Sequence, residues 1–535
     1  MSNEFTGTIR QAFGKLKAVP LSWVAAAVVI FAVAFRWVKK ISGLELLGLP
    51  AEYDQIEPMA IGIAIFSVAA LCGIFAYVLR KKNFSLHKMY LLCGLYLGIL
   101  YMVVLPPLSA PDEWAHYATA YKISNYLVGA EAVDEDGYIM VQTEEMSGNA
   151  QAWPDAGEYQ YYWENYFGKE TSDEMIPSNQ RGNQTFLASY VPQALGITLA
   201  RILGLNFASR ILFGRIFNLI WSVFAVSLAI KWMPFGKKIL FAVAMLPMSL
   251  HEMASNSYDA WIIAFSMLFI AYCMKLAYEK DRVENRDVAI LACLIGLLAP
   301  CKIVYTPIIG LCLLIPKEKF GNIKRWGVSA AIVLGALVVM MLIVNGQTLS
   351  WDAEADVADN YVSHAGEQGY TFSYFLEHPI ELPVIMLNTL KVSGMLYLKT
   401  MLGWRLGQLD INLQISDAFF VVLIVLVILF FIPGADEPRV FRKGNKVWMT
   451  VLIGAVAFLT MFSMLVAWTA ISSDVITGVQ GRYFLPVLPL GAMVLFTDGN
   501  LVVRRQHERL LSAGFAVYHV FLLAELFGQV LMVQG

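Results

Sequence analysis

Long apolar segments alternate with short polar ones along nearly the whole chain. Several apolar segments reach the roughly 20 residues that a helix needs to cross a bilayer, and the charged residues fall between them. This pattern predicts an all-α integral membrane protein with about 13 membrane-spanning helices. The predicted spans are residues 19–38, 59–79, 86–105, 210–230, 239–254, 257–277, 288–300, 303–316, 326–345, 416–433, 447–470, 483–498 and 510–532.

Basic residues predict how these spans are oriented. The loop between the second and third spans carries Arg80, Lys81, Lys82 and Lys88, which places it in the cytoplasm. The later basic loops also fall inside if the apolar stretches 187–204 and 380–402 lie flat in the outer interface. The N-terminus is then cytoplasmic, and the polar stretch 106–186, with fourteen acidic residues, lies outside.

The composition excludes a soluble protein. Hydrophobic residues make up 58% of the 535 residues and charged residues 15%, whereas soluble domains are about one quarter charged. The mean hydropathy is +0.60. The formal net charge of -2 gives no indication of nucleic-acid binding. All six cysteines lie in predicted membrane segments, where we expect them to pack as small apolar side chains, without disulfides or a cysteine metal site.

Four polar clusters, far apart in the sequence, are predicted to meet at the outer face. The first is the segment PPLSAPDEWAH at 106–116, where prolines end the third span and Asp112, Glu113 and His116 follow. On a helix Asp112 and His116 would share a face, and a carboxylate in such a site can act as a general base. The two acids would equally suit the N-terminus of an interfacial helix without a catalytic role.

The other three clusters supply further acids, amides and cations. Asp259 ends the polar turn that begins at His251, and ionisable groups near membrane depth are usually functional, although short outer turns are also polar because they are wet. Lys302 and Arg482 could bind a phosphate, and a lysine reaching toward water is the alternative for Lys302. The remaining candidates for this anionic site are Arg215, Asn218, Tyr258, Gln480 and Tyr483.

At these same elements the chain resembles a family of bacterial multi-pass membrane proteins long catalogued only as a domain of unknown function, which looks related to the GT-C glycosyltransferases. The matching segments are 106–116, 190–196, 214–218, 246–260, 297–307 and 479–489. The resemblance implies a GT-C-like core at 86–535, with outer loops at 106–209 and 346–415, behind an N-terminal two-helix addition at 1–85.

GT-C enzymes take a sugar from a polyprenyl-phosphate or polyprenyl-diphosphate donor and pass it to an acceptor outside the cytoplasmic membrane. The resemblance makes Asp112 the candidate base, Glu113 its neighbour or substitute, and His116 the residue that orients one of them. Lys302 and Arg482, with Arg215, would hold the donor phosphate. Asn218, Tyr258, Asp259, Gln480 and Tyr483 would contact the substrate. A divalent metal is possible but not indicated.

The expected function is therefore an inverting glycosyltransferase of the bacterial cytoplasmic membrane. Its expected partners are a polyprenyl-phosphate sugar, a cell-envelope glycan or lipid acceptor, and membrane lipid, with no nucleic acid. A transporter or flippase of lipid-linked saccharides is one alternative, and it would place ionisable residues near the bilayer midplane between repeated, broken helices. A polymerase or ligase of lipid-linked glycans is another.

Overall fold

The computed structural model describes residues 20–46, 56–80, 85–146, 156–182, 186–349, 361–407, 413–434, 441–496 and 505–530. The basic residues Lys81 and Lys82 and parts of the second outer loop, at 350–360 and 408–412, lie outside these described residues.

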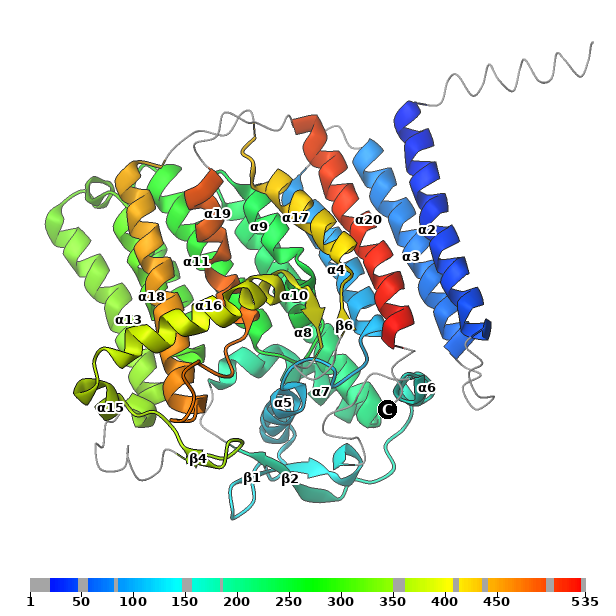
Figure 1. The fold of residues 1–535 in the computed structure, drawn as a ribbon, viewed down its shortest axis with the longest axis horizontal. Helices are drawn as coiled ribbons and strands as arrows, with labels where there is room; N and C mark the ends of the chain where they lie inside the picture. The colour runs from blue at the N-terminus through cyan, green and yellow to red at the C-terminus, as the bar shows by residue number, and fades with distance from the viewer. Residues whose placement is uncertain are drawn as a thin grey trace, which may run out of the picture.

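Eight described helices are long and apolar enough to cross a membrane. A helix satisfies its main-chain hydrogen bonds internally, which is why an apolar sequence in lipid takes this form. Figure 1 shows them side by side as a roughly parallel bundle. They are α2 (Leu21–Leu46), α3 (Ile56–Arg80), α4 (Leu86–Val104), α8 (Phe207–Trp232), α11 (Asp259–Tyr278), α13 (Ile323–Leu349), α18 (Lys443–Trp468) and α20 (Arg505–Val530).

The other predicted spans are helical too, but each is short or interrupted. Pro247 and Pro486 lie in two of the interrupted segments. The prediction of an all-α multi-pass membrane protein is confirmed, while the count of 13 spans stays a prediction, because these segments do not reach the length of a full crossing. They are α9 (Lys237–Ala244) with α10 (Pro247–Met253), α12 (Asn285–Leu298), η5 (Ile303–Leu314), α17 (Asp417–Phe431), and η7 (Gly481–Val487) with α19 (Leu488–Phe496).

One end of the bundle carries most of the remaining structure (Figure 1). The described strands pair only as three two-stranded antiparallel sheets, β1 with β2, β3 with β4, and β5 with β6. The elements there are α5 (Glu113–Val128), β1 (Tyr138–Gln142), η2 (Thr143–Met146), α6 (Ala156–Asn165), β2 (Met175–Arg181), η3 (Leu187–Tyr190), α7 (Val191–Ile202), β3 (Tyr361–Val362), β4 (Glu367–Gln368), α15 (Phe372–Glu377), α16 (Glu381–Leu402), β5 (Arg405–Leu406) and β6 (Leu413–Gln414).

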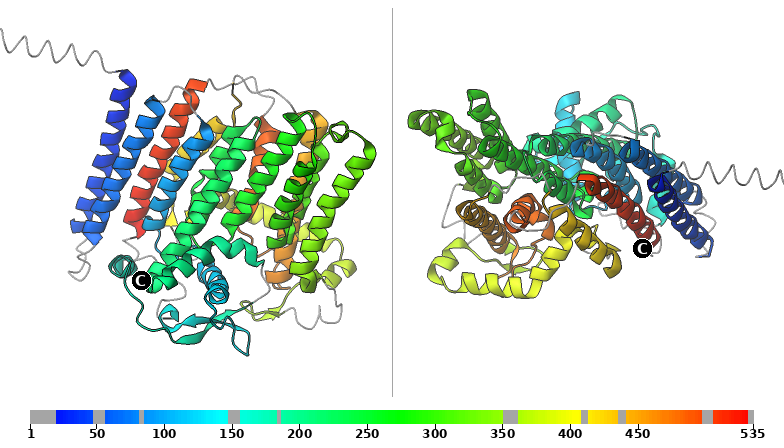
Figure 2. Two further views of the ribbon diagram at one scale, coloured as in Figure 1. Left: turned by 180° about the vertical axis from the view of Figure 1, so that it is seen from behind. Right: turned by 90° about the horizontal axis from the view of Figure 1, so that it is seen from above.

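Two of these helices, α7 and α16, are the stretches expected to lie flat. Neither is among the eight candidate spans, and α16 runs across the bundle helices in Figure 1 and along the edge of the bundle in the view from above in Figure 2. Side chains on one side of α16, including Leu387, Val392 and Met395, are 65–69% exposed. An exposed apolar side on a crosswise helix is typical of a helix in the membrane interface.

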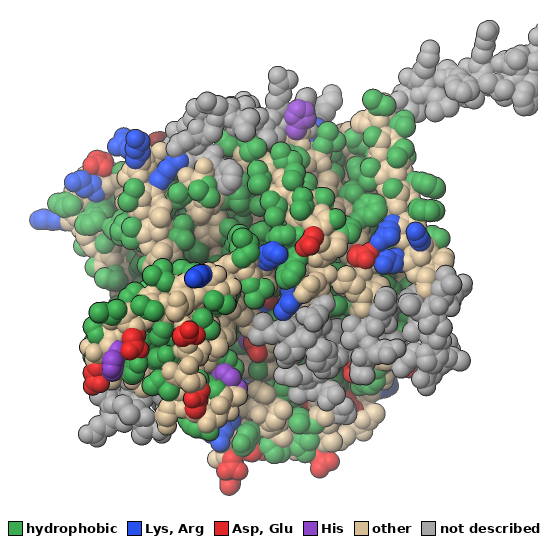
Figure 3. All heavy atoms as spheres, in the orientation of Figure 1, with side chains coloured by type: hydrophobic (Ala, Val, Ile, Leu, Met, Phe, Trp, Pro, Cys, Tyr) green, Lys and Arg blue, Asp and Glu red, His purple; other side chains and the backbone are tan. Residues whose placement is uncertain are grey.

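Charge is distributed unevenly between the two ends of the molecule. The face in Figure 3 is broadly apolar over the bundle, with several Lys and Arg side chains near the start of α18 and several Asp and Glu side chains near α15 and the β1–β2 sheet. The most enclosed span is α11, whose apolar window is 94% buried inside the protein, against 17% for α2 and 22% for α13. Asp259, the first residue of α11, therefore enters the site from the best-packed helix of the bundle.

The N-terminal pair packs beside the C-terminal helix. Arg36 of α2 forms an ion pair with Glu525 of α20, and the Nζ atom of Lys40 lies 3.3 Å from the same carboxylate. The division into an addition at 1–85 and a core at 86–535 stays a prediction.

Candidate active site

One buried arginine holds the proline-rich loop that follows α4. The Nη atoms of Arg215 donate to the carbonyl oxygens of Leu105 at 2.8 Å and Pro106 at 2.9 Å. Its Nε and Nη2 atoms each donate to the Glu113 carboxylate at 2.6 Å, and the backbone N–H of Asn256 donates to the same carboxylate at 2.9 Å. Arg215 and Glu113 are 1% and 0% exposed. The pair therefore fixes the loop and is closed to a ligand.

This geometry argues against two of the sequence-based assignments. Burial raises the pKa of Glu113, but the Arg215 guanidinium and the N–H groups of Asn256 and Ala110 outweigh it and hold that pKa below its usual value. A carboxylate that is fully committed to a buried partner is a poor general base. Arg215 is likewise unable to serve as a phosphate ligand, because its donors are already used.

Asp112 has the opposite environment. It takes the left-handed conformation at the N-cap of α5, with φ at 57°, which aspartate tolerates better than most residues. Its side chain is 66% exposed, and its Oδ2 atom lies 3.3 Å from Nη2 of Arg482. Of the two adjacent acids, Asp112 is thus the one that can meet a substrate.

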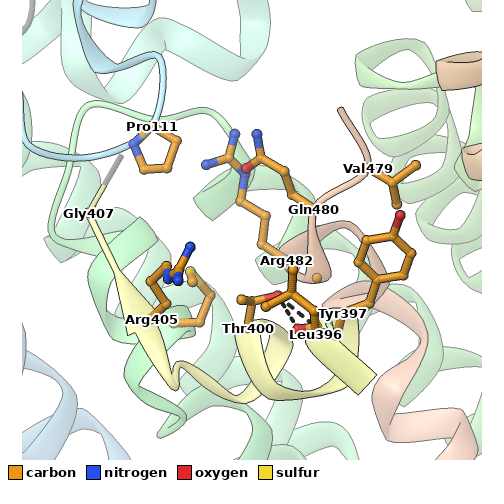
Figure 4. Close-up of a pocket in the computed structure, with 11 residues that line it drawn as sticks. Pro111, Leu396, Tyr397, Thr400, Arg405, Gly407, Val479, Gln480 and Arg482 are labelled. Carbon is orange, nitrogen blue, oxygen red and sulfur yellow. Dashed lines mark hydrogen bonds between the residues drawn. The ribbon is translucent and has the colours of Figure 1, made fainter. Parts of the chain in front are cut away.

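Arg482, in η7, links three carboxylates, one from the N-cap of α5 and two from the segment 251–259. Besides Asp112, its Nη1 atom lies 3.4 Å from Oε1 of Glu252 and its Nε atom 3.0 Å from Oδ2 of Asp259. The Nζ atom of Lys302 lies 3.1 Å from the other oxygen of Asp259. The predicted convergence of Asp112, Lys302 and Arg482 is present as one chain of ion pairs, although of the three only Arg482 lines the cavity drawn in Figure 4.

A glycine allows η7 to approach closely enough to place Arg482. A Cβ atom on Gly481 would lie 2.2 Å from the carbonyl oxygen of Tyr397 and 2.4 Å from the backbone nitrogen of Met401. Both neighbours are backbone atoms of α16, so they cannot move aside independently. The glycine before Arg482 is therefore a requirement of the contact between η7 and α16.

Aromatic rings enclose the ammonium group of Lys302. Its Nζ atom lies 4.1 Å from the ring centre of Tyr483 and 5.2 Å from that of Tyr258. The Tyr305 hydroxyl donates to the carbonyl oxygen of Tyr483 at 2.9 Å. Cation–π contacts of this kind hold a lysine in place. The predicted substrate residues Tyr258 and Tyr483 thus contact Lys302.

His116 lies on the side of Tyr258 away from Lys302, and it lines a polar cavity of about 290 Å³. Its Nδ1 atom lies 2.9 Å from the Tyr190 hydroxyl, not against a carboxylate as predicted. Burial lowers the pKa of His116 to about 4, although the negative charges of Asp259 and Asp112 oppose that shift. The ring is therefore neutral near pH 7. The cavity is lined by Ala115, His116, Thr119, Gln180, Arg181, Phe186, Ser189, Tyr190, Tyr258, Pro300, Cys301 and Asn345.

Asn218 supports the site from behind. Its Nδ2 atom donates to the carbonyl oxygens of Ser255 at 2.8 Å and Ser257 at 3.1 Å, and the residue is 1% exposed. It shapes the turn before Asp259, so the predicted role in substrate contact does not fit its burial. Gln480, in contrast, lines the cavity of Figure 4 beside Arg482.

Sequence reasoning did not identify two basic residues. Arg405, which follows α16, lines the same cavity as Gln480 and Arg482 (Figure 4). Arg210 of α8 is 0% exposed and pairs with Glu145 at 2.7 Å and Glu170 at 2.8 Å, which anchors the first outer loop to the bundle. Neither residue lies in a segment that the resemblance singled out. The acidic partners of Arg210 lie 65 and 40 residues away, and the cavity that Arg405 lines is formed by distant segments, so no local pattern marked either residue.

The arrangement of the acidic side chains bears on whether the site could hold a divalent metal. Among the described residues, no group of three or more His, Cys, Asp or Glu side chains is placed to hold a metal ion. The acids of the site are instead neutralised by Arg482 and Lys302.

Comparison with known proteins assigns the family. Residues 95–491 match the model of a family described as "Predicted membrane protein (DUF2142)". No curated protein and no solved structure matches the chain. The matched range contains every residue of the ion-pair chain, namely Asp112, Glu252, Asp259, Lys302 and Arg482. The chain therefore belongs to the DUF2142 family of multi-pass membrane proteins.

Proposed function

We propose that this protein is an inverting GT-C-type glycosyltransferase that uses a polyprenyl-phosphate sugar and acts at the extracytoplasmic face of the bacterial cytoplasmic membrane. One observation carries the proposal. Asp112, the exposed acid at the N-cap of α5, lies 3.3 Å from Arg482 at the end of an apolar helix bundle. An exposed carboxylate beside fixed cations at a membrane surface suits the transfer of a group from a lipid phosphate.

In the proposed reaction Asp112 accepts the proton of an acceptor hydroxyl. The hydroxyl oxygen forms a bond to the anomeric carbon from the side opposite the phosphate, and the bond from that carbon to the phosphate oxygen breaks. The leaving phosphate keeps the electron pair, and the guanidinium of Arg482 stabilises the charge that develops on it. No step requires a group other than donor, acceptor and these side chains.

The ion-pair chain supports this mechanism because it links the site of donor binding, Arg482, to the proposed base, Asp112. Arg482 already has two nearly buried partners, Glu252 and Asp259, and its third contact is with the exposed Asp112. A donor phosphate would compete with Asp112 for Nη2 of Arg482. Donor binding would thereby separate the Asp112 carboxylate from the guanidinium and leave it able to accept the proton of the acceptor hydroxyl.

The polar cavity beside His116 supports a saccharide as the other reactant. Its walls combine the hydroxyls of Thr119, Ser189 and Tyr190 with the amides of Gln180 and Asn345, and none of its lining residues is acidic. Hydroxyl and amide groups can pair with the many hydroxyls of a sugar, and the neutral ring of His116 adds a further polar contact.

The test is sugar transfer by the purified protein in detergent, with a panel of polyprenyl-phosphate sugars. Asp112→Asn should lower transfer by about 100-fold or more, the contribution of a general base, and should leave the protein folded because the side chain is exposed. Asp173→Asn removes an exposed acid of the same outer loop and should transfer sugar at the wild-type rate.

Two results would count against the proposal. One is full transfer by Asp112→Asn. The other is a wild-type protein that consumes no donor but moves lipid-linked saccharide across reconstituted vesicles, which would assign a transporter instead. Joining of two lipid-linked glycans by the wild type, with no use of a monosaccharide donor, would assign a polymerase or ligase.

A further inference from the structure

We infer that the cavity beside α16 binds the phosphate of a membrane lipid and that Arg405 is one of its ligands. The cavity measures about 70 Å³, room for a few water molecules, which matches a phosphate group better than a saccharide. Figure 4 shows Arg405 entering it from β5 and Arg482 from η7, with Pro111 on the opposite wall. The identity of the lipid as a polyprenyl phosphate rests on the proposed function.

Arg405 is half-buried, and it differs from the buried arginines in lacking an acidic partner among the described residues. Arg210, Arg215 and Arg482 each pair with glutamate or aspartate. In the part of the chain that the structure describes, the contact of the Arg405 guanidinium is with the Trp404 ring, 5.8 Å from its centre. The Nε atom of Arg405 is buried without a hydrogen-bond partner among the described residues, and so is Nε1 of Trp404.

Buried donors without acceptors are costly, and proteins retain few of them. The Nε atom of Arg405 is such a donor on a side chain that lines the cavity, and it is explained if an oxygen-rich ligand occupies that cavity. The ligand is expected to be an anion, because none of the lining residues is acidic and two are arginines. A guanidinium is well shaped for two parallel hydrogen bonds to a phosphate.

The surroundings indicate that this phosphate belongs to a lipid. Leu396 of α16 lines the cavity and is also 42% exposed, so the cavity wall continues onto the exposed apolar side of that helix. Lys399, in the last turn of α16, holds its Nζ atom 4.6 Å from the Trp404 ring, and this adds a second cation near the interface. Basic residues at the edge of an interfacial helix attract anionic headgroups, and the lipid chain can lie along Leu396.

A phosphate in this cavity would contact Arg482, and Arg482 contacts Asp112. The cavity thus connects the lipid interface to the proposed base through a single side chain. Arg405 and Arg482 would grip the phosphate from two sides, whereas Lys302, enclosed by rings and paired with Asp259, stays out of this contact.

The test is direct binding of a polyprenyl monophosphate to the purified full-length protein in detergent, measured by titration calorimetry. Arg405→Gln should weaken binding by at least about tenfold, since it removes charge-assisted hydrogen bonds. Lys391→Gln is the matched control, because Lys391 is an exposed cation on α16 that does not line the cavity, and its affinity should stay within about twofold of wild type. Thermal melting of each variant checks that it is folded.

Three further measurements separate the possible results. A polyprenol without phosphate should not bind, and inorganic phosphate should not displace the lipid at matched concentration. Displacement by inorganic phosphate would overturn the assignment to a lipid, and equal affinity of Arg405→Gln and wild type would overturn the site. Asp112→Asn removes the carboxylate that competes for Arg482, so it should bind the lipid at least as tightly as wild type while losing sugar transfer. Lipid binding that depends on Arg405 in a protein that transfers no sugar would leave this site standing and refute the proposed function.

Discussion

Asp112 and Glu113 are adjacent acids with opposite environments. The left-handed backbone at Asp112 turns its side chain outward, where 66% of it is exposed, while Glu113 points into the protein and meets Arg215. One residue is therefore free to react, and the other holds the loop that presents it. A buried ion pair contributes little net stability, but removing one partner leaves an uncompensated charge.

Glu113→Gln is accordingly expected to destabilise the protein strongly. The substitution leaves the buried guanidinium of Arg215 without its counter-charge, which costs about 3–5 kcal/mol for a buried pair. Thermal unfolding in detergent should show a large drop in the midpoint for Glu113→Gln and a small change for Asp112→Asn. Equal unfolding midpoints for Glu113→Gln and wild type would show that the Glu113–Arg215 pair does not stabilise the fold. Glu113 would then again be a candidate base.

Among the contacts between secondary-structure elements, the site depends most on the contact between η7 and α16. Arg482 enters the ion-pair chain from a 3₁₀ segment that lies against the backbone of an interfacial helix. A helix in the interface and a segment of the bundle are thereby joined at one residue, Gly481. The cavity of Figure 4 lies at this junction, and a small shift of η7 would separate Arg482 from Asp112, Glu252 and Asp259 together.

Gly481→Ala should therefore abolish sugar transfer and weaken lipid binding without unfolding the bundle. The new methyl group would meet backbone atoms of Tyr397 and Met401 at 2.2–2.4 Å, which forces η7 away from α16. Gly491→Ala is the matched control, since a Cβ atom at that position in α19 meets nothing within 4 Å. Transfer and binding assays on both variants test this, and wild-type activity in Gly481→Ala would contradict it.

At the scale of the whole molecule, the two faces of the bundle are distinct. Figure 1 shows that α2 begins at the face opposite α5, whereas α20 ends at the face that carries α5. A chain that starts at one face and finishes at the other crosses an odd number of times. The proposed site, the interfacial helices and the acidic first loop all lie at the second face, which the proposed function requires to be the extracytoplasmic one.

A C-terminal fusion reports on that assignment. Alkaline phosphatase fused after Gly535 of the full-length chain should be active in cells, because it folds only outside the cytoplasm, and green fluorescent protein fused at the same position should not fluoresce. The positive-inside distribution of Lys and Arg is the physical reason for this orientation. If the green fluorescent protein fusion fluoresces and the alkaline phosphatase fusion is inactive, the C-terminus is cytoplasmic. The site would then face the wrong compartment for the proposed donor.

The helices could be predicted from the sequence because a helix that crosses the bilayer needs about 20 predominantly apolar residues. Each of the predicted spans falls on a described helical element, and the polar segments 106–116, 251–259 and 480–483 fall at the ends of helices. Most candidate residues lie in those segments, and three of them, Asp112, Asp259 and Arg482, form one ion-pair chain with the candidate Lys302.

The residue roles could not be predicted in the same way. Arg215 and Arg482 are both arginines near polar turns, and only the packing shows that one is enclosed by Glu113 and loop carbonyls while the other also lines a cavity. Arg405 lies in the predicted second outer loop, but in none of the segments that carry the family resemblance. Partners in these contacts are separated by about one hundred to several hundred residues, as in the 370 residues between Asp112 and Arg482.

By itself, the sequence determined that the chain is a multi-pass membrane protein with its acids concentrated in loops, because hydrophobic length and charge position act locally on each segment. Only the tertiary structure decided which acid is exposed, which arginine already has its donors paired, and which cavity contains a hydrogen-bond donor without an acceptor. Those properties depend on burial and on partners from distant helices, and the energy of a charge in a protein is set by what surrounds it.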